Sequence, residues 1–253
     1  MGQTAAGVRS DGPHDTRTRG LRSSVLSWLG RSTGPGRLAV TYLSNHIWHM
    51  NDTKNGPDRQ LLFARATQQG GHFTTAQARE CGYSRSLLSH HAGTGEFIRI
   101  HRGVYRFRDY PSHPRGEVIA AWLAAGPDRA AVSHESALEL LDLSDVVPSS
   151  IHITVPRARR GFAPPPGVTL HTTTRPFGQG QVTVRDGMRV TAPARSIVDA
   201  AEAGIAPEQV RRAVTEAIAR GLTNRRHLLA MARSRGSRVQ KLVEHGVSRV
   251  GRS

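Results

Sequence analysis

Cysteine is nearly absent, since Cys81 is the only one among 253 residues. One thiol cannot form an intramolecular disulfide, and it cannot supply a cysteine-rich zinc site. Lysine is almost as scarce, with Lys54 and Lys241 alone. A small nuclease domain needs an acid-x-lysine element, and only Lys54 has an acidic residue, Asp52, two positions earlier. That position lacks a strand-like context, so we expect no nuclease.

Long apolar runs are also missing. No stretch approaches the roughly 20 apolar residues of a membrane span, and the N-terminus lacks the layout of a signal peptide. We therefore expect no membrane partner and a cytoplasmic location. Glycine-rich phosphate loops, nucleophile elbows and paired-carboxylate layouts are absent from the sequence too. It predicts neither an enzyme nor a cofactor.

Positive charge is abundant, because 35 Lys and Arg outnumber 19 Asp and Glu and give a net charge of +16. Such a balance favours an anionic partner, since each neutralised phosphate releases condensed counterions. The arginine bias of a GC-rich genome is an alternative source of the same charge. No segment forms a polybasic tail, so any binding specificity has to come from folded structure.

Residues 1–56 differ from the rest of the chain. Gly, Ser, Thr and Arg dominate much of this segment, and no apolar period is sustained, which predicts a disordered leader. Two interpretations stay open. In one, the natural polypeptide begins at Met50, just before the patterned region. In the other, the leader is an arginine-bearing arm that folds onto DNA or a partner, with Trp28 and Trp48 as anchors.

Residues 57–110 show the order helix, short helix, tight turn, helix and hairpin. Thr74-x-x-Gln77 is a capping box that begins the short helix. Gly82 tolerates the backbone dihedrals of a steep turn between two helices, and Ser84 caps the helix after it. This order predicts a winged helix-turn-helix.

The last helix and the hairpin of such a unit carry its contacts with double-stranded DNA. The helix lies in the major groove, where arginine reads guanine with two hydrogen bonds. Cations on the hairpin, formed by residues 97–101 and 104–108, meet phosphates or the minor groove. The alternative is a unit used only for packing or dimerisation, with solvated arginines. The predicted DNA-binding residues are Arg85, Ser86, Ser89, His90, Arg99, Arg102 and Arg106.

The pattern changes after Pro111. Residues 151–155 and 168–172 alternate like strands, a hairpin follows over residues 181–190, and helices flank these runs. We expect an α+β fold in which a mixed α/β domain over residues 111–235 follows the winged helix over 57–110. Residues 236–253 are expected to form a flexible basic tail.

Histidines offer the remaining candidate chemistry. His134–Glu135 at a helix start lacks a third catalytic partner, so we expect Ser133 to cap that helix and Glu135 to favour its dipole. His152 and His171 share the outward phase of their strands and would share a face if these strands pair. A metal site usually wants three or four ligands, so surface histidines are the favoured interpretation.

Two arginine features are also open to more than one interpretation. The loop with Arg157, Arg159 and Arg160 is a second phosphate contact, a toxin-facing patch or, as we favour, a solvated loop. Arg195 and Asp199 are four residues apart and are expected to form an exposed ion pair.

A family resemblance rests on several sequence segments that occur in the same order. GHFTTAQARECGYSRSLLSHHAGTGEFIRIHRGVYRF resembles the N-terminal domain of the AbiEi family, antitoxins of type IV toxin–antitoxin systems. The similarity continues through AAVSHESALELLDLSDVVPSSIHITVPRARR, GVTLHTT and VTVRDGMRVTAPARSIVDAA, and covers roughly residues 57–235. Residues 1–56 have no counterpart in it, and His90–His91 replace a more basic helix end.

The resemblance implies a winged helix that binds DNA and represses its own operon. It also implies a following domain that counters a nucleotidyltransferase-type toxin, so the implied partners are double-stranded DNA and a cognate toxin. The recognition-helix and wing positions fall on Arg85, Ser86, Arg99, Arg102 and Gly103. The alternative function is a toxin-neutralising interaction module with little or no specific DNA binding.

Overall fold

The computed structural model describes residues 56–145, 147–174 and 177–249. All of them belong to one compact unit, Asn55–Ser253. The expected disordered leader, with Trp28, Trp48 and a start at Met50, lies outside the described residues except for Gly56.

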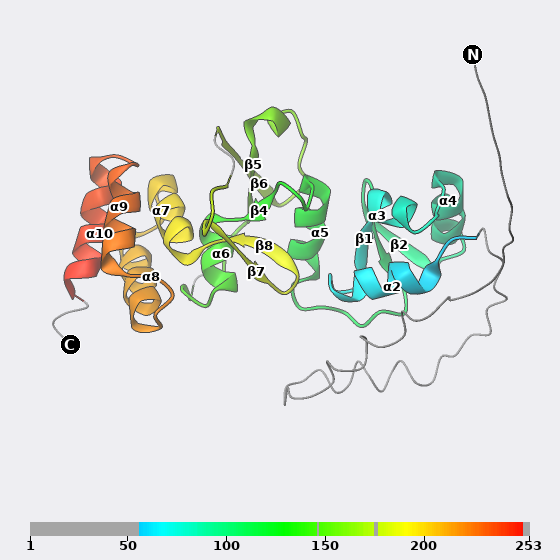
Figure 1. The fold of residues 1–253 in the computed structure, drawn as a ribbon, viewed down its shortest axis with the longest axis horizontal. Helices are drawn as coiled ribbons and strands as arrows, with labels where there is room; N and C mark the ends of the chain where they lie inside the picture. Colours follow the sequence, from blue (N-terminus) through cyan, green and yellow to red (C-terminus); the bar gives the residue numbers. More distant parts are fainter. Residues whose placement is uncertain (1–55, 146, 175–176, 250–253) are drawn as a thin grey trace, which may run out of the picture. The chain divides into compact units, whose positions relative to one another are not determined.

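The first part of the unit has the expected order of elements (Figure 1). Its sheet is antiparallel in the order β1-β3-β2, and the short strand β1 was not predicted from the sequence. The elements are α2 (Arg59–Thr67), β1 (His72–Thr74), α3 (Thr75–Glu80), α4 (Arg85–Gly93), β2 (Phe97–His101) and β3 (Val104–Phe107).

The helix caps and the turn glycine predicted from the sequence are confirmed in this part. The Thr74 hydroxyl accepts from the Gln77 backbone N–H at 3.1 Å, and the Gln77 side chain accepts from the Thr74 N–H at 2.8 Å, so the capping box is complete. The Ser84 hydroxyl accepts from the Leu87 N–H at 3.1 Å. Gly82 has a φ of +85°, which a residue with a side chain rarely adopts.

The second part is a five-stranded mixed sheet in the order β6-β5-β4-β8-β7. Strands β5 and β6 pair in parallel, as do β4 and β8, while the other neighbours are antiparallel. The α+β fold class is therefore confirmed. The elements are α5 (Gly116–Ala125), β4 (Ala131–Val132), α6 (His134–Leu140), β5 (Ile151–Pro156), η1 (Arg157–Arg159), β6 (Val168–Thr173), β7 (Val182–Arg185) and β8 (Met188–Thr191).

Helix α5 packs against both sheets. Its side chains from Ile119 to Leu123 are buried, as expected for a helix that is covered on more than one face. Val104 of β3 joins the same apolar cluster as Ile153 of β5. At the turn between β7 and β8, a Cβ on Gly187 would lie 1.9 Å from the carbonyl oxygen of Gln68. The parts of the chain before and after residue 111 thus pack against each other. Their division into separate domains at that residue stays a prediction.

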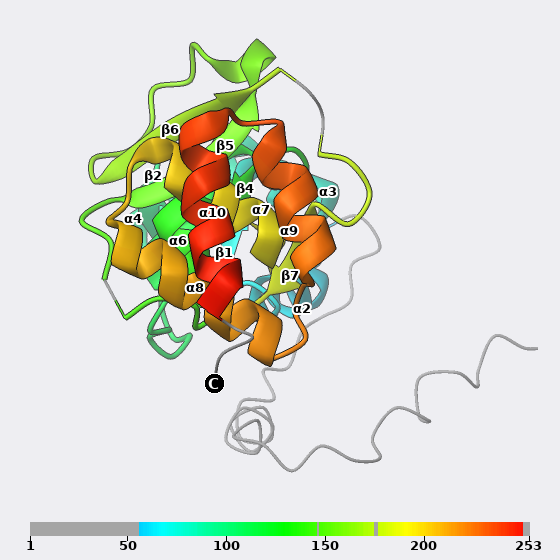
Figure 2. The same ribbon diagram turned by 90° about the vertical axis from the view of Figure 1, so that its left-hand side faces the viewer.

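Four helices follow the second sheet in the chain, and in Figure 2 they lie in front of its strands. They are α7 (Pro193–Ala203), α8 (Pro207–Ala219), α9 (Arg225–Arg233) and α10 (Ser237–Arg249). The last one corrects the prediction of a flexible tail over residues 236–253. Val239, Val243 and Val247 recur every four residues and form a buried stripe against α7 and α8. The arginine content of this segment concealed that stripe.

The ion pair expected on the surface is buried instead. Arg195 Nε lies 2.7 Å from Asp199 Oδ2, and Arg235 Nη2 lies 2.8 Å from Asp199 Oδ1. The Asp199 side chain is only 3% exposed, because α7 buries almost its whole circumference. Sequence spacing showed the pair but not Arg235, which lies in the turn between α9 and α10 and joins the pair from 36 residues away.

Removing the Asp199 carboxylate should destabilise the fold strongly. We expect Asp199→Ala to lower the free energy of unfolding by about 3–5 kcal/mol, because Arg195 and Arg235 lose the charge that compensates them. Urea denaturation of the full chain measures this change. Glu208→Ala is the matched control. It breaks an ion pair with Arg211, but the Glu208 side chain is 66% exposed, so we expect the denaturation midpoint to stay unchanged. Equal midpoints for the two variants would contradict the role given to the buried pair.

Candidate nucleic-acid interface

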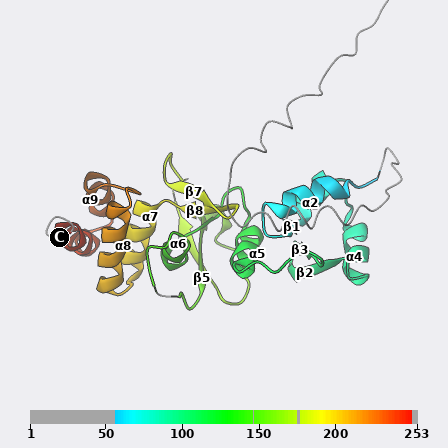
Figure 3. The ribbon, with the colours of Figure 1, turned by 90° about the horizontal axis from the view of Figure 1, so that it is seen from below.

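Helix α4 offers one polar face to solvent. Arg85, Ser86, Ser89 and His90 are all exposed, whereas Leu88 between them is fully buried. Residues one turn apart lie on the same side of a helix, so these four side chains form a continuous surface. Figures 1 and 3 place α4 on the side of the winged helix opposite α5. This face is therefore not covered by the second sheet.

An ion-pair cluster fixes the end of α4. Glu96 lies 2.7 Å from Arg59 Nε and 2.6 Å from His91 Nδ1, which links α2, α4 and the start of β2. Burial alone would raise the pKa of Glu96, but the hydrogen bonds and charges of Arg59 and His91 outweigh it and lower that pKa. His91 also packs against Phe97, with ring centroids 5.1 Å apart. His91 thus serves the fold, while His90 stays exposed beside it.

The hairpin distributes its arginines over two faces. Arg99 pairs with Tyr105 across the strands and Arg106 pairs with Ile98. Since successive residues alternate between faces of a strand, Arg99 and Arg106 lie on opposite sides. Arg99 shares the side of Phe97, which packs in the same cluster as Leu88 of α4.

Arg106 differs from the other predicted contact residues. It is half-buried, and its Nη1 donates to the carbonyl of Tyr110 at 3.2 Å. Arg99 and Arg102 are exposed. The turn that carries Arg102 is held in place, because the Thr75 N–H donates to the carbonyl of Gly103 at 2.9 Å. The structure thus brings six of the seven predicted residues to exposed positions on α4 and the wing and engages Arg106 within the fold.

The histidines of the second sheet form a cluster that sequence reasoning missed. His152 Nδ1 lies 2.9 Å from His171 Nε2 on the neighbouring strand, and the His134 ring stacks on His171 with centroids 3.6 Å apart. Strands β5 and β6 do pair, so His152 and His171 share a face as expected, but both are half-buried and the interpretation as surface histidines is wrong. Ser133 does not cap α6 with its side chain, and its hydroxyl instead contacts His134 Nδ1 at 2.9 Å. Periodicity could place the two strand histidines on one face, but not the helix that adds the third.

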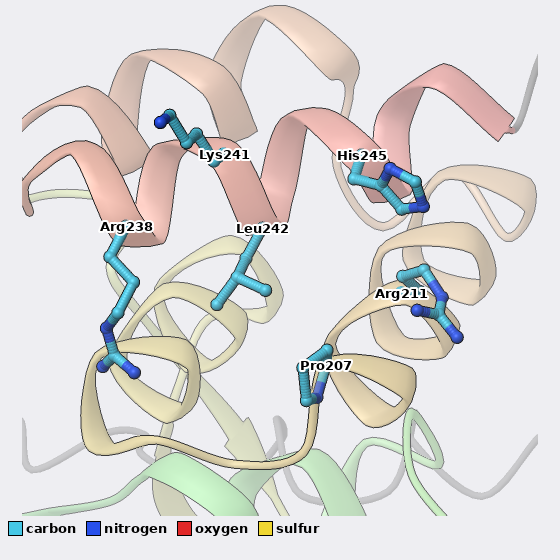
Figure 4. A pocket seen from close by; sticks show the side chains of 6 residues that line it. All are labelled: Pro207, Arg211, Arg238, Lys241, Leu242 and His245. Atoms are coloured by element: carbon cyan, nitrogen blue, oxygen red, sulfur yellow. The ribbon is translucent and has the colours of Figure 1, made fainter.

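Two further basic features lie outside the winged helix. In the predicted arginine loop, Arg157 and Arg160 are exposed, and Arg159 lies 5.6 Å from the centre of the Phe162 ring. A pocket between α8 and α10 has a largely apolar surface with basic side chains around it, as Figure 4 shows. Two of these side chains are already engaged, because Arg238 donates to the carbonyl of Glu202 and Arg211 is paired with Glu208. Its lining residues are Pro207, Arg211, Arg238, Lys241, Leu242 and His245.

Comparisons with known proteins agree with this architecture. The chain is similar to the crystal structure of the RV2827C protein from Mycobacterium tuberculosis, with 16% sequence identity and a TM-score of 0.50 over 80% of this chain and 82% of that one. At this identity the likeness concerns the fold. None of the curated proteins matches the chain. Across the described ranges, no helix has the length and apolar character needed to cross a membrane.

A family model covers the candidate interface itself. The model described as "Transcriptional regulator, AbiEi antitoxin" matches residues 60–108, a range that contains α4, the wing and all seven predicted contact residues. The resemblance read from the sequence is confirmed over residues 60–108, where the chain is similar to the AbiEi antitoxin family of transcriptional regulators.

Proposed function

We propose that this chain is a transcriptional regulator that binds double-stranded DNA in the cytoplasm and represses its own operon. The observation that carries the proposal is the exposed face of α4, with Arg85, Ser86 and Ser89, beside the exposed wing arginines Arg99 and Arg102. This surface lies within the segment that matches a family of transcriptional regulators. The proposed activity is binding, without a catalytic step.

Helix α4 and the wing have different tasks in this proposal. Arg85 is the first residue of α4, and the N-terminal residues of a recognition helix are those that reach base edges. Ser86 and Ser89 are short, which lets the helix approach the floor of the major groove. Arg99 and Arg102 contact phosphates, so they position the protein rather than select a sequence. We expect a smaller role for Arg106, since the Tyr110 carbonyl already engages its guanidinium.

A second candidate function is the neutralisation of a protein toxin. The pocket between α8 and α10 favours it, because Leu242 and Pro207 help to give it a largely apolar surface and the exposed Lys241 adds a positive charge beside it (Figure 4). An acidic segment of a partner protein fits such a surface. We propose that a nucleotidyltransferase-type toxin, as the family suggests, is this partner and that the same chain also binds DNA.

Substitutions of Arg85 and Arg102 should change DNA binding in different ways. We expect Arg85→Ala to relax sequence preference and to cost about 1–3 kcal/mol of binding free energy at the preferred site. Arg102→Ala should weaken binding to all sequences alike and reduce the slope of log K against log salt by about 1. Gel-shift titrations against the promoter of the chain's own operon measure both effects.

Arg226→Ala is the matched control for that experiment, because Arg226 is an exposed arginine on α9 outside the winged helix. It should bind DNA as the wild type does. Wild-type affinity and salt slope in the double variant Arg85→Ala/Arg102→Ala would reject the assigned surface.

Charge reversal in the pocket should separate toxin binding from DNA binding. We expect Lys241→Glu to weaken binding to the purified toxin of the same operon by about 10-fold or more, the equivalent of 1.4 kcal/mol, and to leave promoter affinity unchanged. Calorimetry with wild type, Lys241→Glu and Arg226→Glu provides the comparison. An operon that encodes no such toxin, or equal toxin affinity in all three proteins, would count against the second candidate.

A further inference from the structure

Three imidazole rings meet on the second sheet, away from the residues assigned to DNA. His134 begins α6, His152 lies in β5 and His171 lies in β6. One ring nitrogen from each lies within 4.8 Å of those of the other two. Three elements that are distant in sequence therefore place three metal-binding side chains together.

The sheet fixes two of the three rings. In the parallel register of β5 and β6, His152 pairs with Thr169 and Thr154 pairs with His171. The two histidines are thus offset by two positions, which keeps them on one face of the sheet. His152 Nδ1 and His171 Nε2 face each other at 2.9 Å.

The third ring is held by an unusual backbone. His134 has a φ of +53°, a left-handed conformation that few residues with a side chain adopt. Such a conformation persists where its surroundings determine it. Here the neighbouring Ser133 hydroxyl contacts His134 Nδ1 at 2.9 Å and also contacts Thr154 Oγ1 at 2.8 Å. His134 itself is 8% exposed.

Hydrogen bonds on the outer nitrogens orient two of the three rings. Ser133 occupies Nδ1 of His134, and Ser150 Oγ lies 3.2 Å from Nε2 of His152. Ser150 is in turn 2.8 Å from Thr169 Oγ1. Metal-bound histidines use this arrangement, in which one ring nitrogen is hydrogen-bonded and the other binds the ion. It leaves Nε2 of His134, Nδ1 of His152 and Nε2 of His171 as the inner donors.

The electrostatic surroundings keep the rings neutral. Burial, followed by the charges of the neighbouring histidines, Arg195 and Arg235, lowers the pKa of His134 to about 2. Burial and His152 lower the pKa of His171 to about 4, and burial lowers the pKa of His152. Neutral imidazole is the form that binds a metal. The two arginines are themselves paired with Asp199, and Glu135 is near enough to His152 to act on its pKa.

We propose that His134, His152 and His171 form a binding site for one divalent transition metal ion of the zinc class. Imidazole donors suit zinc and its neighbours, and three histidines with one open position are a known coordination set. A tetrahedral ion with metal–nitrogen distances of about 2.0–2.1 Å separates its donors by about 3.3 Å. The observed 2.9 Å between His152 and His171 needs to widen by a few tenths of an ångström.

All three rings have to adjust for the ion to bind, because the planes of His152 and His171 are also within 17° of parallel. The planes of His134 and His171 are within 17° of parallel, and a nitrogen lone pair lies in the plane of its ring. The His134 ring therefore turns about its Cβ–Cγ bond to aim Nε2 at the shared ion. His152 and His171 are half-buried rather than fully enclosed, so water has access to the fourth position.

The test uses the untagged full-length chain, because a histidine tag would bind the same ions. Titration with Co²⁺ followed by visible absorption, and with Zn²⁺ by calorimetry, should give one saturable site with a tetrahedral Co²⁺ spectrum. His134→Gln, His152→Gln and His171→Gln should each weaken Zn²⁺ binding by at least about 10-fold, since even loss of an outer hydrogen-bond partner has that effect. Ser150→Ala should weaken it as well. His227→Gln, an exposed histidine on α9, is the control and should bind as the wild type does.

Several results would overturn the proposal. Wild-type protein that shows no saturable binding of either ion would do so, whatever the variants show. Equal Zn²⁺ affinity in the wild type and the three cluster variants would place the ion elsewhere, as would an equal loss in His227→Gln. Circular dichroism of the metal-free proteins checks that the variants are folded. An increase in melting temperature with Zn²⁺ in the wild type that is lost in His152→Gln would support the site independently of DNA binding.

Discussion

The candidate interface depends on a small aromatic core beneath α4. Phe73, Phe97 and Phe107 pack with ring centroids 5.0 to 5.3 Å apart, and Leu88 of α4 enters the same cluster. This packing sets which side of α4 is buried and therefore which side carries Arg85 and the serines. The hairpin contributes Phe97 and Phe107 to that core, so α4 and the wing are positioned by the same contacts.

Polar contacts then fix what apolar packing leaves adjustable. Glu96 joins α2, α4 and β2 through Arg59 and His91, and the Gly103 carbonyl holds the wing turn against α3. These contacts fix the position of the wing, with its exposed Arg99 and Arg102, relative to helix α4. A protein that reads bases and phosphates at once requires this geometry. Helix α5 packs the same unit against the second sheet, because Val104 of β3 and Ile153 of β5 share one apolar cluster with it.

Local patterns in the sequence predicted most of the winged helix. Thr74, Gln77, Gly82 and Ser84 act through hydrogen bonds and dihedrals within four residues of themselves, so their roles are visible without tertiary structure. Long-range contacts were not visible in this way. The third member of the buried ion pair, Arg235, and the third member of the histidine cluster, His134, come from other elements. The valine stripe of α10 lay within a basic segment, where charge outweighed periodicity in our interpretation.

The central claim is that the winged helix binds DNA with sequence preference. The most direct test is the affinity of the full chain for its own promoter and for an unrelated fragment of equal length, measured at several salt concentrations. We predict tighter binding to the promoter, and a linear fall of log K with log salt at a slope of roughly 0.9 for each phosphate contacted. Equal affinity for both fragments, or binding that does not change with salt, would contradict the claim.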